Sequence, residues 1–437
     1  MALPPWSRQG LHVIAKPTGP ICNLRCEYCF YLEKESLYAE GETWRMSDET
    51  LSAYVRQYIE AQPDVVEEID FAFQGGEPTL LGIDFFRRVL QLQKEYAPPG
   101  KRIHNSLQTN GVLLDDRWCE FLREHGFLVG LSLDGPADLH DRYRRDKQGR
   151  RTFDRVIRAM RCLQEHGVEF NVLTCVTRHN GDHPARVYRF LRESGVQFVQ
   201  FIPIVEPLGV AAANAEALVS GRSVRPEQFG RFLIGVFEEW VRHDVGRIFV
   251  RDFDQALAAW AGAGANLCIY AKHCGRATAI EHNGDLYSCD HFVDPQHKLG
   301  NIHRTPIREL ANSARQEQFG RDKERTLPEC CRRCRFLFIC NGACPKDRFL
   351  AAPDGQAGLN YLCEGYRLFF EHVDPSMKAM AAELAAGRPA ANVMRQLRAR
   401  QERVRREAAA TDGPIRRNDH CPCGSGRKFK SCCMRRA

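Results

Sequence analysis

The segment Cys22-Asn23-Leu24-Arg25-Cys26-Glu27-Tyr28-Cys29 places three cysteines, spaced C-x3-C-x2-C, on one loop directly after a β-rich run at residues 11–16. Three thiolates on such a loop can hold three irons of a [4Fe–4S] cluster and leave the fourth iron open to a ligand from outside the protein. A structural zinc site prefers four protein ligands, so a group of three indicates an open coordination position. An incomplete zinc site and redox-active thiols are the alternatives.

Short β-rich runs alternate with amphipathic helical segments from residue 11 to about residue 205. The β-rich runs lie at residues 11–16, 69–74, 106–109, 127–133, 170–176 and 198–204, and the helix candidates at residues 47–61, 82–96, 115–125, 152–166 and 182–194. This alternation predicts parallel strands joined by right-handed crossovers. It fits both a partial or full barrel and an open doubly wound sheet, and periodicity alone does not choose between them.

The 437 residues include 19 cysteines, an odd number that excludes complete pairing into disulfides within one chain. Most lie in groups of three or four, which in an intracellular protein indicates metal or iron–sulfur ligation. Hydrophobic residues make up 43% and charged residues 27%, values that exclude long disorder and a coiled-coil rod. The first residues show no secretory signal and no membrane span is convincing, so we expect a cytoplasmic protein.

Two motifs together resemble the radical S-adenosylmethionine (SAM) superfamily. Phe30-Tyr31 follows the cysteine loop, and Gly75-Gly76-Glu77-Pro78 follows the second β-rich run, like the superfamily's GGEP motif. The resemblance implies an α/β fold, a partial (β/α)6 TIM-like barrel with its chemistry at the C-terminal ends of the strands. It also implies that SAM chelates the open iron, and that an electron from the cluster releases a 5′-deoxyadenosyl radical that abstracts a hydrogen atom from substrate.

Further residues near the strand ends match the superfamily's cofactor-binding motifs, at residues 131–136, 140–144 and 201–205. The resemblance implies SAM contacts by Tyr28, Gly75, Gly76, Glu77, Ser132, Arg144 and Val205. The glycines would let the backbone approach the methionine amino group of the cofactor. A plain core position is the alternative for Val205, and a solvated place in a basic run is the alternative for Arg144.

Eight cysteines between residues 268 and 363 resemble the SPASM domain, an iron–sulfur extension of radical enzymes that modify peptides and proteins. The resemblance implies two auxiliary [4Fe–4S] clusters, three clusters in all. The first would be held by Cys268, Cys274, Cys289 and Cys344, and the second by Cys331, Cys334, Cys340 and Cys363. A pair of zinc ribbons is the alternative, and Cys330 leaves the assignment of Cys331 ambiguous by one residue.

Asp290 follows Cys289 directly, and this Cys-Asp pair resembles the one found at the same place in the anaerobic sulfatase-maturating enzymes. Those enzymes oxidise an active-site Cys or Ser of a sulfatase to Cα-formylglycine. The resemblance implies that the radical takes a Cβ hydrogen, that Asp290 is the general base, and that an auxiliary cluster accepts the second electron. It places Tyr31 and Gln74 near substrate, although pocket-wall positions for both, and a turn role for Asp290, are alternatives.

Two other functions fit parts of this pattern. The same machinery could mature a ribosomal peptide by thioether formation or epimerisation, or the clusters could belong to a non-catalytic iron–sulfur electron carrier. For the enzyme, we expect a low-potential electron donor such as flavodoxin or ferredoxin and a sulfatase polypeptide as substrate.

The C-terminal residues 417–433 resemble the SEC-C motif, in which Cys421, Cys423, Cys432 and Cys433 would bind a structural zinc. Residues 395–437 contain 13 Lys and Arg against 4 Asp and Glu, so the basicity of the chain lies in this tail. Docking to a protein or nucleic acid is one role for the tail, and a solvated basic helix is the alternative.

The predicted domains are the radical SAM barrel at residues 1–240, the SPASM domain at 241–375, a basic helical linker at 376–414 and the SEC-C motif at 415–437. Cys119, Cys162 and Cys175, together with Cys330, belong to no predicted ligand set. The first three lie in predicted barrel helices and strands, where a free cysteine usually acts as a small apolar residue.

Overall fold

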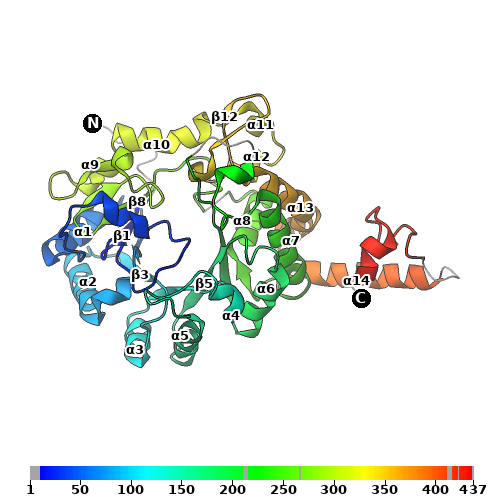
Figure 1. Cartoon of the computed structure of the whole chain (residues 1–437), viewed down its shortest axis with the longest axis horizontal. Helices are drawn as coiled ribbons and strands as arrows, with labels where there is room; N and C mark the ends of the chain where they lie inside the picture. Colours follow the sequence, from blue (N-terminus) through cyan, green and yellow to red (C-terminus); the bar gives the residue numbers. More distant parts are fainter. Residues whose placement is uncertain (1–9, 210–214, 265–266, 411–415, 422, 436–437) are drawn as a thin grey trace.

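The computed structural model describes residues 10–209, 215–264, 267–410, 416–421 and 423–435. Its centre is a ten-stranded sheet with the strand order β10-β9-β8-β1-β2-β3-β4-β5-β6-β7. The helices that follow the strands lie around the outside of this sheet (Figure 1). Because β7 and β10 are its two edges, the sheet is an incomplete barrel, which confirms the α/β partial-barrel prediction.

The predicted βα alternation is present, with boundaries that move by a few residues. The strands are β1 (His12–Lys16), β2 (Glu68–Phe73), β3 (Arg102–Thr109), β4 (Leu128–Ser132), β5 (Phe170–Val176), β6 (Phe198–Pro203) and β7 (Phe249–Val250), and neighbours are parallel. The helices between them are α1 (Asp48–Glu60), α2 (Ile83–Tyr96), α3 (Asp116–Glu124), α4 (Ala137–His140), α5 (Phe153–Glu165) and α6 (Pro184–Glu193). Strand β3 begins four residues before the predicted start, because Arg102 pairs in register with Glu68.

The Cys-rich region adds three strands to the same sheet, a pairing that no local pattern in its sequence indicates. They are β8 (Ala277–Glu281), β9 (Asp285–Tyr287) and β10 (Lys298–Asn301). Strand β8 runs parallel to β1, with Lys16 opposite Glu281, and β9 and β10 continue the sheet antiparallel. The C-terminal end of β8 therefore lies at the same edge of the sheet as the cysteine loop after β1. The division into domains stays a prediction.

The remaining elements are mostly helical. They are α7 (Pro226–His243), α8 (Arg251–Trp260), α9 (Ile307–Ala311), α10 (Ala314–Arg325), α11 (Glu329–Arg332), α12 (Leu337–Cys340), α13 (Cys363–Ala385), α14 (Asn392–Ala410) and the hairpin β11 (Leu350–Ala351) and β12 (Ala357–Leu359). Short 3-10 helices lie at Leu32–Leu37, Pro78–Leu81, Ala215–Leu218, Pro295–His297, Pro345–Asp347, Phe429–Ser431 and Cys433–Arg435. The basic helical linker expected at residues 376–414 contains the end of α13 and all of α14, and its residues 411–414 lie outside the described part of the chain.

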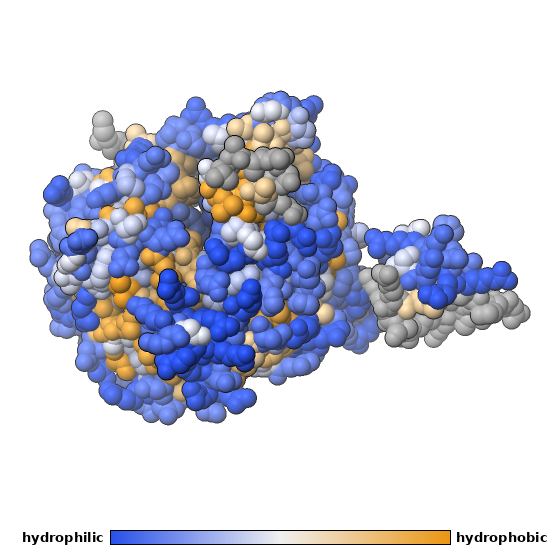
Figure 2. Space-filling model, in the orientation of Figure 1, coloured by the Kyte–Doolittle hydropathy of each residue, from blue (hydrophilic) through white to orange (hydrophobic). Residues whose placement is uncertain are grey.

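The joint between α13 and α14 is held by one carboxylate. Glu383 accepts hydrogen bonds from Arg388 Nε at 2.8 Å, Asn392 Nδ2 at 2.6 Å and Gln396 Nε2 at 3.1 Å. These bonds, with Arg388 first, lower the pKa of Glu383 to about 2. Helix α14 then projects from the body, and the C-terminal module lies beside it (Figure 1). The visible face of that module is mostly hydrophilic (Figure 2).

No helix within the described residues combines the length and apolar character that crossing a membrane requires. The large apolar side chains are instead packed inside the molecule, where α7 and α13 form one of its main helix contacts.

Helices α7 and α13 touch backbone to backbone through two buried glycines. A Cβ on Gly365 would lie 2.0 Å from the carbonyl oxygen of Pro226, and a Cβ on Gly230 would lie 2.5 Å from that of Gly365. Neither contact is with the movable end of a side chain, so a methyl group at either position would separate the helices.

We expect Gly365→Ala to lower the free energy of unfolding by about 1–3 kcal/mol, the usual cost of overpacking. The direction of the change in the free energy of unfolding is informative, because alanine ordinarily stabilises a helix relative to glycine. Thermal denaturation of the wild type and the variant measures the change. Gly221→Ala is the matched control, since a Cβ there meets no atom within 4 Å. A Gly365→Ala protein as stable as the wild type would contradict this packing.

Candidate active site

Residues that follow strands from distant parts of the chain meet at the C-terminal edge of the sheet. The cysteine loop follows β1, the Gly-Gly-Glu turn follows β2, and Asp134 comes two residues after β4. Glu281 ends β8, the parallel neighbour of β1 on its other side. Because parallel strands end at one edge, these groups gather in one place.

The cysteine loop is held by backbone contacts and carries half-buried thiols. Cys22 Sγ accepts hydrogen bonds from Leu24 N at 3.3 Å and from Asn110 Nδ2 at 3.6 Å. Burial raises the pKa of Cys22 to about 11 and that of Cys26 to about 12. These thiols would ionise only beside a cation, and iron supplies one, since ligation displaces the thiol proton. Three half-buried thiols on one loop therefore suit an iron–sulfur cluster with one iron left open.

The Gly-Gly-Glu turn lies against the start of the cysteine loop. A Cβ on Gly76 would be 1.9 Å from the carbonyl oxygen of Ile21, so only glycine fits there. Glu77 is buried, and its carboxylate accepts hydrogen bonds from Thr109 Oγ1 at 2.7 Å and Asn110 N at 2.8 Å. The turn is thereby tied to the end of β3. The SAM contacts predicted for Gly75, Gly76 and Glu77 stay predictions, and the carboxylate of Glu77 serves the turn itself.

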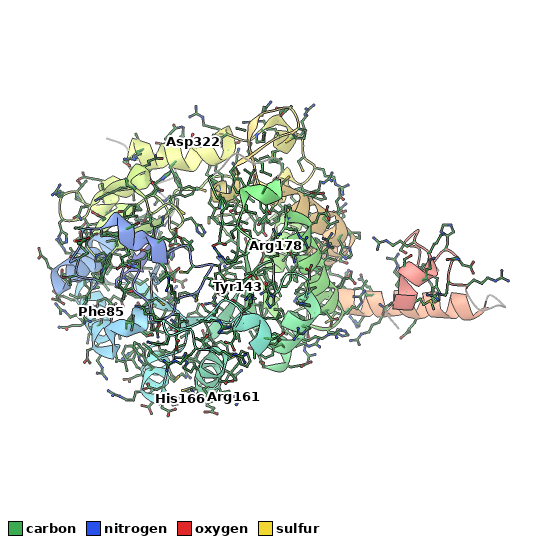
Figure 3. The ribbon with its side chains drawn as sticks, viewed as in Figure 1. Phe85, Tyr143, Arg161, His166, Arg178 and Asp322 are labelled. Atoms are coloured by element: carbon green, nitrogen blue, oxygen red, sulfur yellow. The ribbon has the colours of Figure 1, made fainter. Side chains whose placement is uncertain are left out.

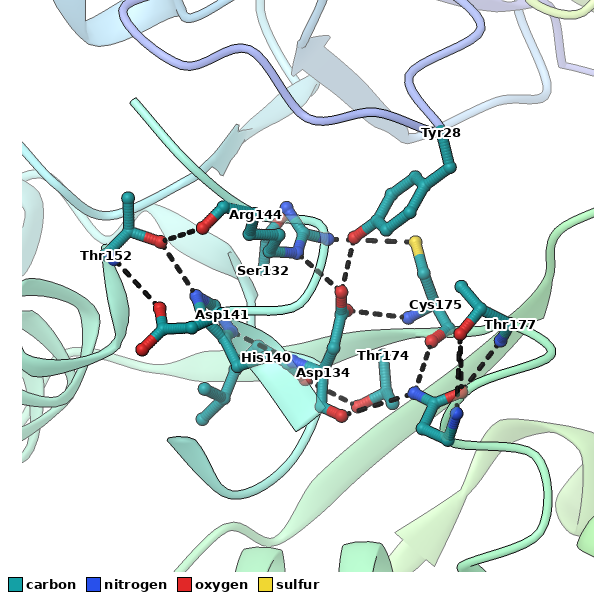
Figure 4. Close-up of polar contacts among 12 residues, drawn as sticks. Tyr28, Ser132, Asp134, His140, Asp141, Arg144, Thr152, Thr174, Cys175 and Thr177 are labelled. Carbon is teal, nitrogen blue, oxygen red and sulfur yellow. Dashed lines mark hydrogen bonds and ion pairs between the residues drawn. The ribbon is translucent and has the colours of Figure 1, made fainter. Parts of the chain in front are cut away.

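Asp134 is the centre of a polar network beneath the cysteine loop (Figure 4). It accepts hydrogen bonds from Arg144 Nε at 2.8 Å, from Cys175 N at 2.9 Å and from the hydroxyl of Tyr28. Burial works against the charged guanidinium, but the attraction of Asp134 outweighs it and raises the pKa of Arg144. Arg144 is buried, so its alternative as a solvated member of a basic run is wrong. Ser132, at the end of β4, accepts a bond from Gln108 Nε2 at 3.2 Å.

A neutral histidine supports this network from below. Burial lowers the pKa of His140 to about 4, so its ring is uncharged at neutral pH. Asp134 N donates to His140 Nδ1 at 3.3 Å, which places the ring proton on Nε2, 3.0 Å from Thr152 Oγ1. Thr152 Oγ1 in turn donates to the carbonyl oxygen of Arg144 at 2.9 Å. The position of Arg144 is thus fixed through both its side chain and its backbone.

Asp290 is paired with Lys16 across the β1–β8 junction. The Lys16 side chain is 2% exposed, that of Asp290 is 17% exposed, and their charged groups form an ion pair. Burial would raise the pKa of Asp290, but Lys16 and then His291 outweigh it and lower the pKa. The ammonium group of Lys16 also lies 3.8 Å from the centre of the Tyr31 ring, and the Tyr31 hydroxyl donates to Glu281. Asp290 is therefore a carboxylate held in its ionised form at the edge that bears the cysteine loop.

Three of these residues were missed in the sequence. Lys16, Asp134 and Glu281 each end or follow a strand and carry a charge into a buried position. A lysine at the end of an apolar run, directly before Pro17, was the available signal for Lys16.

The remaining predicted residues lie at or near the same edge. Tyr31 is buried, and its hydroxyl is engaged by Glu281. Gln74 is half-buried, and its backbone N donates to Ala15 O at 2.9 Å. Val205 follows β6 and packs in the main core, as its alternative expected. The substrate contacts of Tyr31 and Gln74 and the SAM contacts of Tyr28, Ser132, Arg144 and Val205 stay predictions.

The auxiliary cysteines fall into two interacting sets. Electrostatic interactions join Cys289 to Cys268 and Cys344, and Cys344 to Cys274. A second set of interactions links Cys340 to Cys331 and Cys334, and Cys363 to Cys340, Cys334 and Cys330. The assignment of these cysteines to two clusters stays a prediction. Cys330 and Cys331 both interact with Cys363, so the choice between them stays open.

A left-handed turn separates the two sets. Cys340 and Cys344 are four residues apart, and Asn341 and Ala343 between them have φ values of 43° and 53°. Such values are unusual for residues other than glycine. The turn directs neighbouring cysteines into different sets. Arg348, which donates to the carbonyl oxygens of Asn341 and Gly342, interacts with cysteines of both.

The tail cysteines are arranged differently. The sulfur atoms of Cys421, Cys423, Cys432 and Cys433 all lie within 4.8 Å of one another. Tetrahedral Zn–S bonds of about 2.3 Å would place the sulfur atoms about 3.8 Å apart, so the four thiols suit a single zinc ion. No group of cluster cysteines is drawn together this tightly within the described part of the chain, as expected for ligands that surround a larger cluster.

Sequence models of three protein families match separate parts of the chain. The radical SAM superfamily matches residues 17–191, an iron–sulfur cluster-binding domain (SPASM) matches residues 268–335, and the SEC-C motif matches residues 417–435.

Known proteins match most of the chain. The serine-type anaerobic sulfatase-maturating enzyme of Bacteroides thetaiotaomicron is 45% identical, over 89% of this chain and 95% of that enzyme. The cysteine-type enzyme of Clostridium perfringens is 34% identical, over 84% and 97%. The structure of native anSMEcpe with bound AdoMet and Cp18Cys peptide, 33% identical, superimposes with a TM-score of 0.77 over 86% and 99%. This chain therefore belongs to the anaerobic sulfatase-maturating enzymes of the radical SAM superfamily.

Proposed function

We propose that this enzyme oxidises an active-site Ser or Cys side chain of a sulfatase to Cα-formylglycine. The observation that carries the proposal is the ion pair between Asp290 and the buried Lys16, at the C-terminal edge of the sheet that also bears the cysteine loop. The reaction removes a hydrogen atom from the substrate Cβ and a proton from the hydroxyl or thiol attached to it. It therefore requires a proton acceptor next to the site that generates the radical.

The chain offers a binding place for each cofactor of this reaction. Cys22, Cys26 and Cys29 would hold a [4Fe–4S] cluster, and the two auxiliary sets would hold two more. Tyr28, Gly75, Gly76, Ser132 and Arg144 would surround SAM, and the four tail cysteines would hold zinc. When bound, SAM and the iron–sulfur clusters would supply a radical that removes the substrate Cβ hydrogen and an acceptor for the second electron. The tail zinc would take no part in this chemistry.

Asp290 would take the proton of the substrate hydroxyl or thiol. This role needs a carboxylate that is ionised before substrate arrives, and Lys16 keeps it so despite its burial. Lys16 is itself fixed by the Tyr31 ring above it and by its place in β1 beside Glu281. The base is therefore positioned by the sheet rather than by a flexible loop alone.

The relatives bear on the substrate class. Greater identity to the serine-type enzyme, 45% against 34% for the cysteine-type enzyme, supports a serine-containing sulfatase motif. The peptide bound in the anSMEcpe structure supports a polypeptide as the form in which substrate is presented. A low-potential donor such as flavodoxin or ferredoxin would deliver the electron.

Asp290→Asn tests the base. We expect it to lower aldehyde formation on a sulfatase-motif peptide about 100-fold to 10,000-fold, the usual contribution of a general base. Formation of 5′-deoxyadenosine should continue, because the cofactor site is intact. Mass spectrometry of the peptide and chromatography of the nucleoside measure the two products, with serine and cysteine peptides compared. Asp294→Asn, an acid of the same segment that caps Pro295–His297, is the matched control.

Two results would contradict the proposal. One is a wild-type enzyme that releases 5′-deoxyadenosine but never oxidises sulfatase peptides, which would favour maturation of another peptide. The other is a wild-type protein that binds its clusters yet releases no 5′-deoxyadenosine when reduced with SAM, which would favour an electron carrier.

Lys16→Met tests the partner of the base. The neutral side chain leaves the Asp290 carboxylate without its ion pair, so we expect a lower ratio of aldehyde to 5′-deoxyadenosine at unchanged iron content. Lys16→Arg keeps the charge and should restore part of the ratio. An unchanged ratio in Lys16→Met, measured by the same two products, would show that Asp290 works without this pairing.

A further inference from the structure

A second group of metal-ligating side chains lies on the outer surface of the barrel, where α3 meets α5. Asp116 is the first residue of α3, Cys162 lies in the last turn of α5, and His166 follows that helix directly. His166 lies at the periphery of the molecule (Figure 3). Cys162 and His166 are four residues apart, so they share one helix face.

The three donor atoms converge. Asp116 Oδ1 lies 3.1 Å from His166 Nε2 and 3.5 Å from Cys162 Sγ, and the three ligand atoms lie within 4.8 Å of one another. The Asp116 side chain is 82% exposed, and Cys162 and His166 are half-buried. A cation can therefore reach the group from solvent without opening the fold.

A second thiol lies behind these three. Cys119, three residues after Asp116 on α3, is buried, and burial together with the neighbouring Cys162 raises the pKa of its thiol. Asp115 and Glu165 interact electrostatically with the two thiols and make the surroundings negative. One oxygen, one nitrogen and two sulfur donors with this charge suit a borderline-soft divalent cation.

We propose that Asp116, Cys162 and His166 bind a zinc-type divalent cation, with Cys119 available as the fourth ligand. Binding replaces the hydrogen bonds within the group by bonds to the metal, and the Cys162 thiol releases its proton to solvent. The ion would join α3 to α5 on the outside of the barrel. The site is separate from the cluster cysteines, from Asp290 and from the tail, and it goes beyond the proposed function.

The test is the zinc content of the full-length protein with its iron–sulfur clusters reconstituted anaerobically. The protein is incubated with zinc chloride alone and passed through a gel-filtration column, and its metals are measured by mass spectrometry. We expect about two zinc ions per chain in the wild type, one from the tail and one from this site. Cys162→Ser and His166→Gln should each lose about one of the two, a twofold decrease, as should Cys421→Ser in the tail.

The controls separate this site from the others. His125→Gln changes a histidine at the end of α3 that contacts Phe121, and it should keep the full zinc content. Combining His166→Gln with Cys421→Ser should remove nearly all zinc, while the iron content and 5′-deoxyadenosine formation stay at the wild-type level. His166→Gln also serves if Cys162→Ser does not fold.

Three outcomes would overturn the proposal. The first is a wild type that retains zinc only at the tail. The second is a zinc content that His166→Gln leaves unchanged. The third is a disulfide between Cys119 and Cys162 in the anaerobic protein, detected by peptide mapping, which would make the thiols a redox pair instead. None of these results depends on sulfatase oxidation, so they leave the proposed function to its own tests.

Discussion

The parallel pairing of β8 with β1 is the constraint on which the site depends. It joins residues more than 260 positions apart in the chain and sets Lys16 beside Glu281. The chain then turns through β9 to Asp290, which returns to Lys16. Without this pairing, nothing in the sheet would bring the Cys-rich region next to the cysteine loop. With it, the Asp290 carboxylate and the cysteine loop share one edge of one sheet.

Charged side chains at this edge are buried or half-buried, and several have partners that offset the charge. Arg144 is paired with Asp134, Asp290 with Lys16, and Glu77 with hydroxyl and backbone donors. Removing one partner of a buried pair is usually costly, because the other charge is left in a poor solvent. The thiols of Cys22 and Cys26 differ in that burial holds them protonated until a metal arrives.

The sequence predicted the individual strands and helices better than it predicted which strands pair in the sheet. The strand and helix periods located β1 to β6 and α1, α2, α3, α5 and α6, because each is a local property of a few turns or residues. The addition of β8 to β10 to the sheet, and hence the Lys16–Asp290 pair, could not be predicted, since pairing between distant strands leaves no local pattern. Motif resemblance predicted the cysteine ligand sets and the SAM contact of Arg144, but the inward orientation of Glu77 depends on Thr109 and Asn110, at the end of another strand.

The joint at Glu383 gives the C-terminal arm a fixed length and direction. The 19 residues of α14 span about 28 Å at 1.5 Å per residue, and Val393 at its start is buried against the body. The terminal module folds back beside this helix, because Arg427 lines the same surface pocket as Glu227 of α7 and Glu364 of α13. The arm is therefore a hairpin of helix and module, and a basic side chain of the module lies beside acidic side chains of the body.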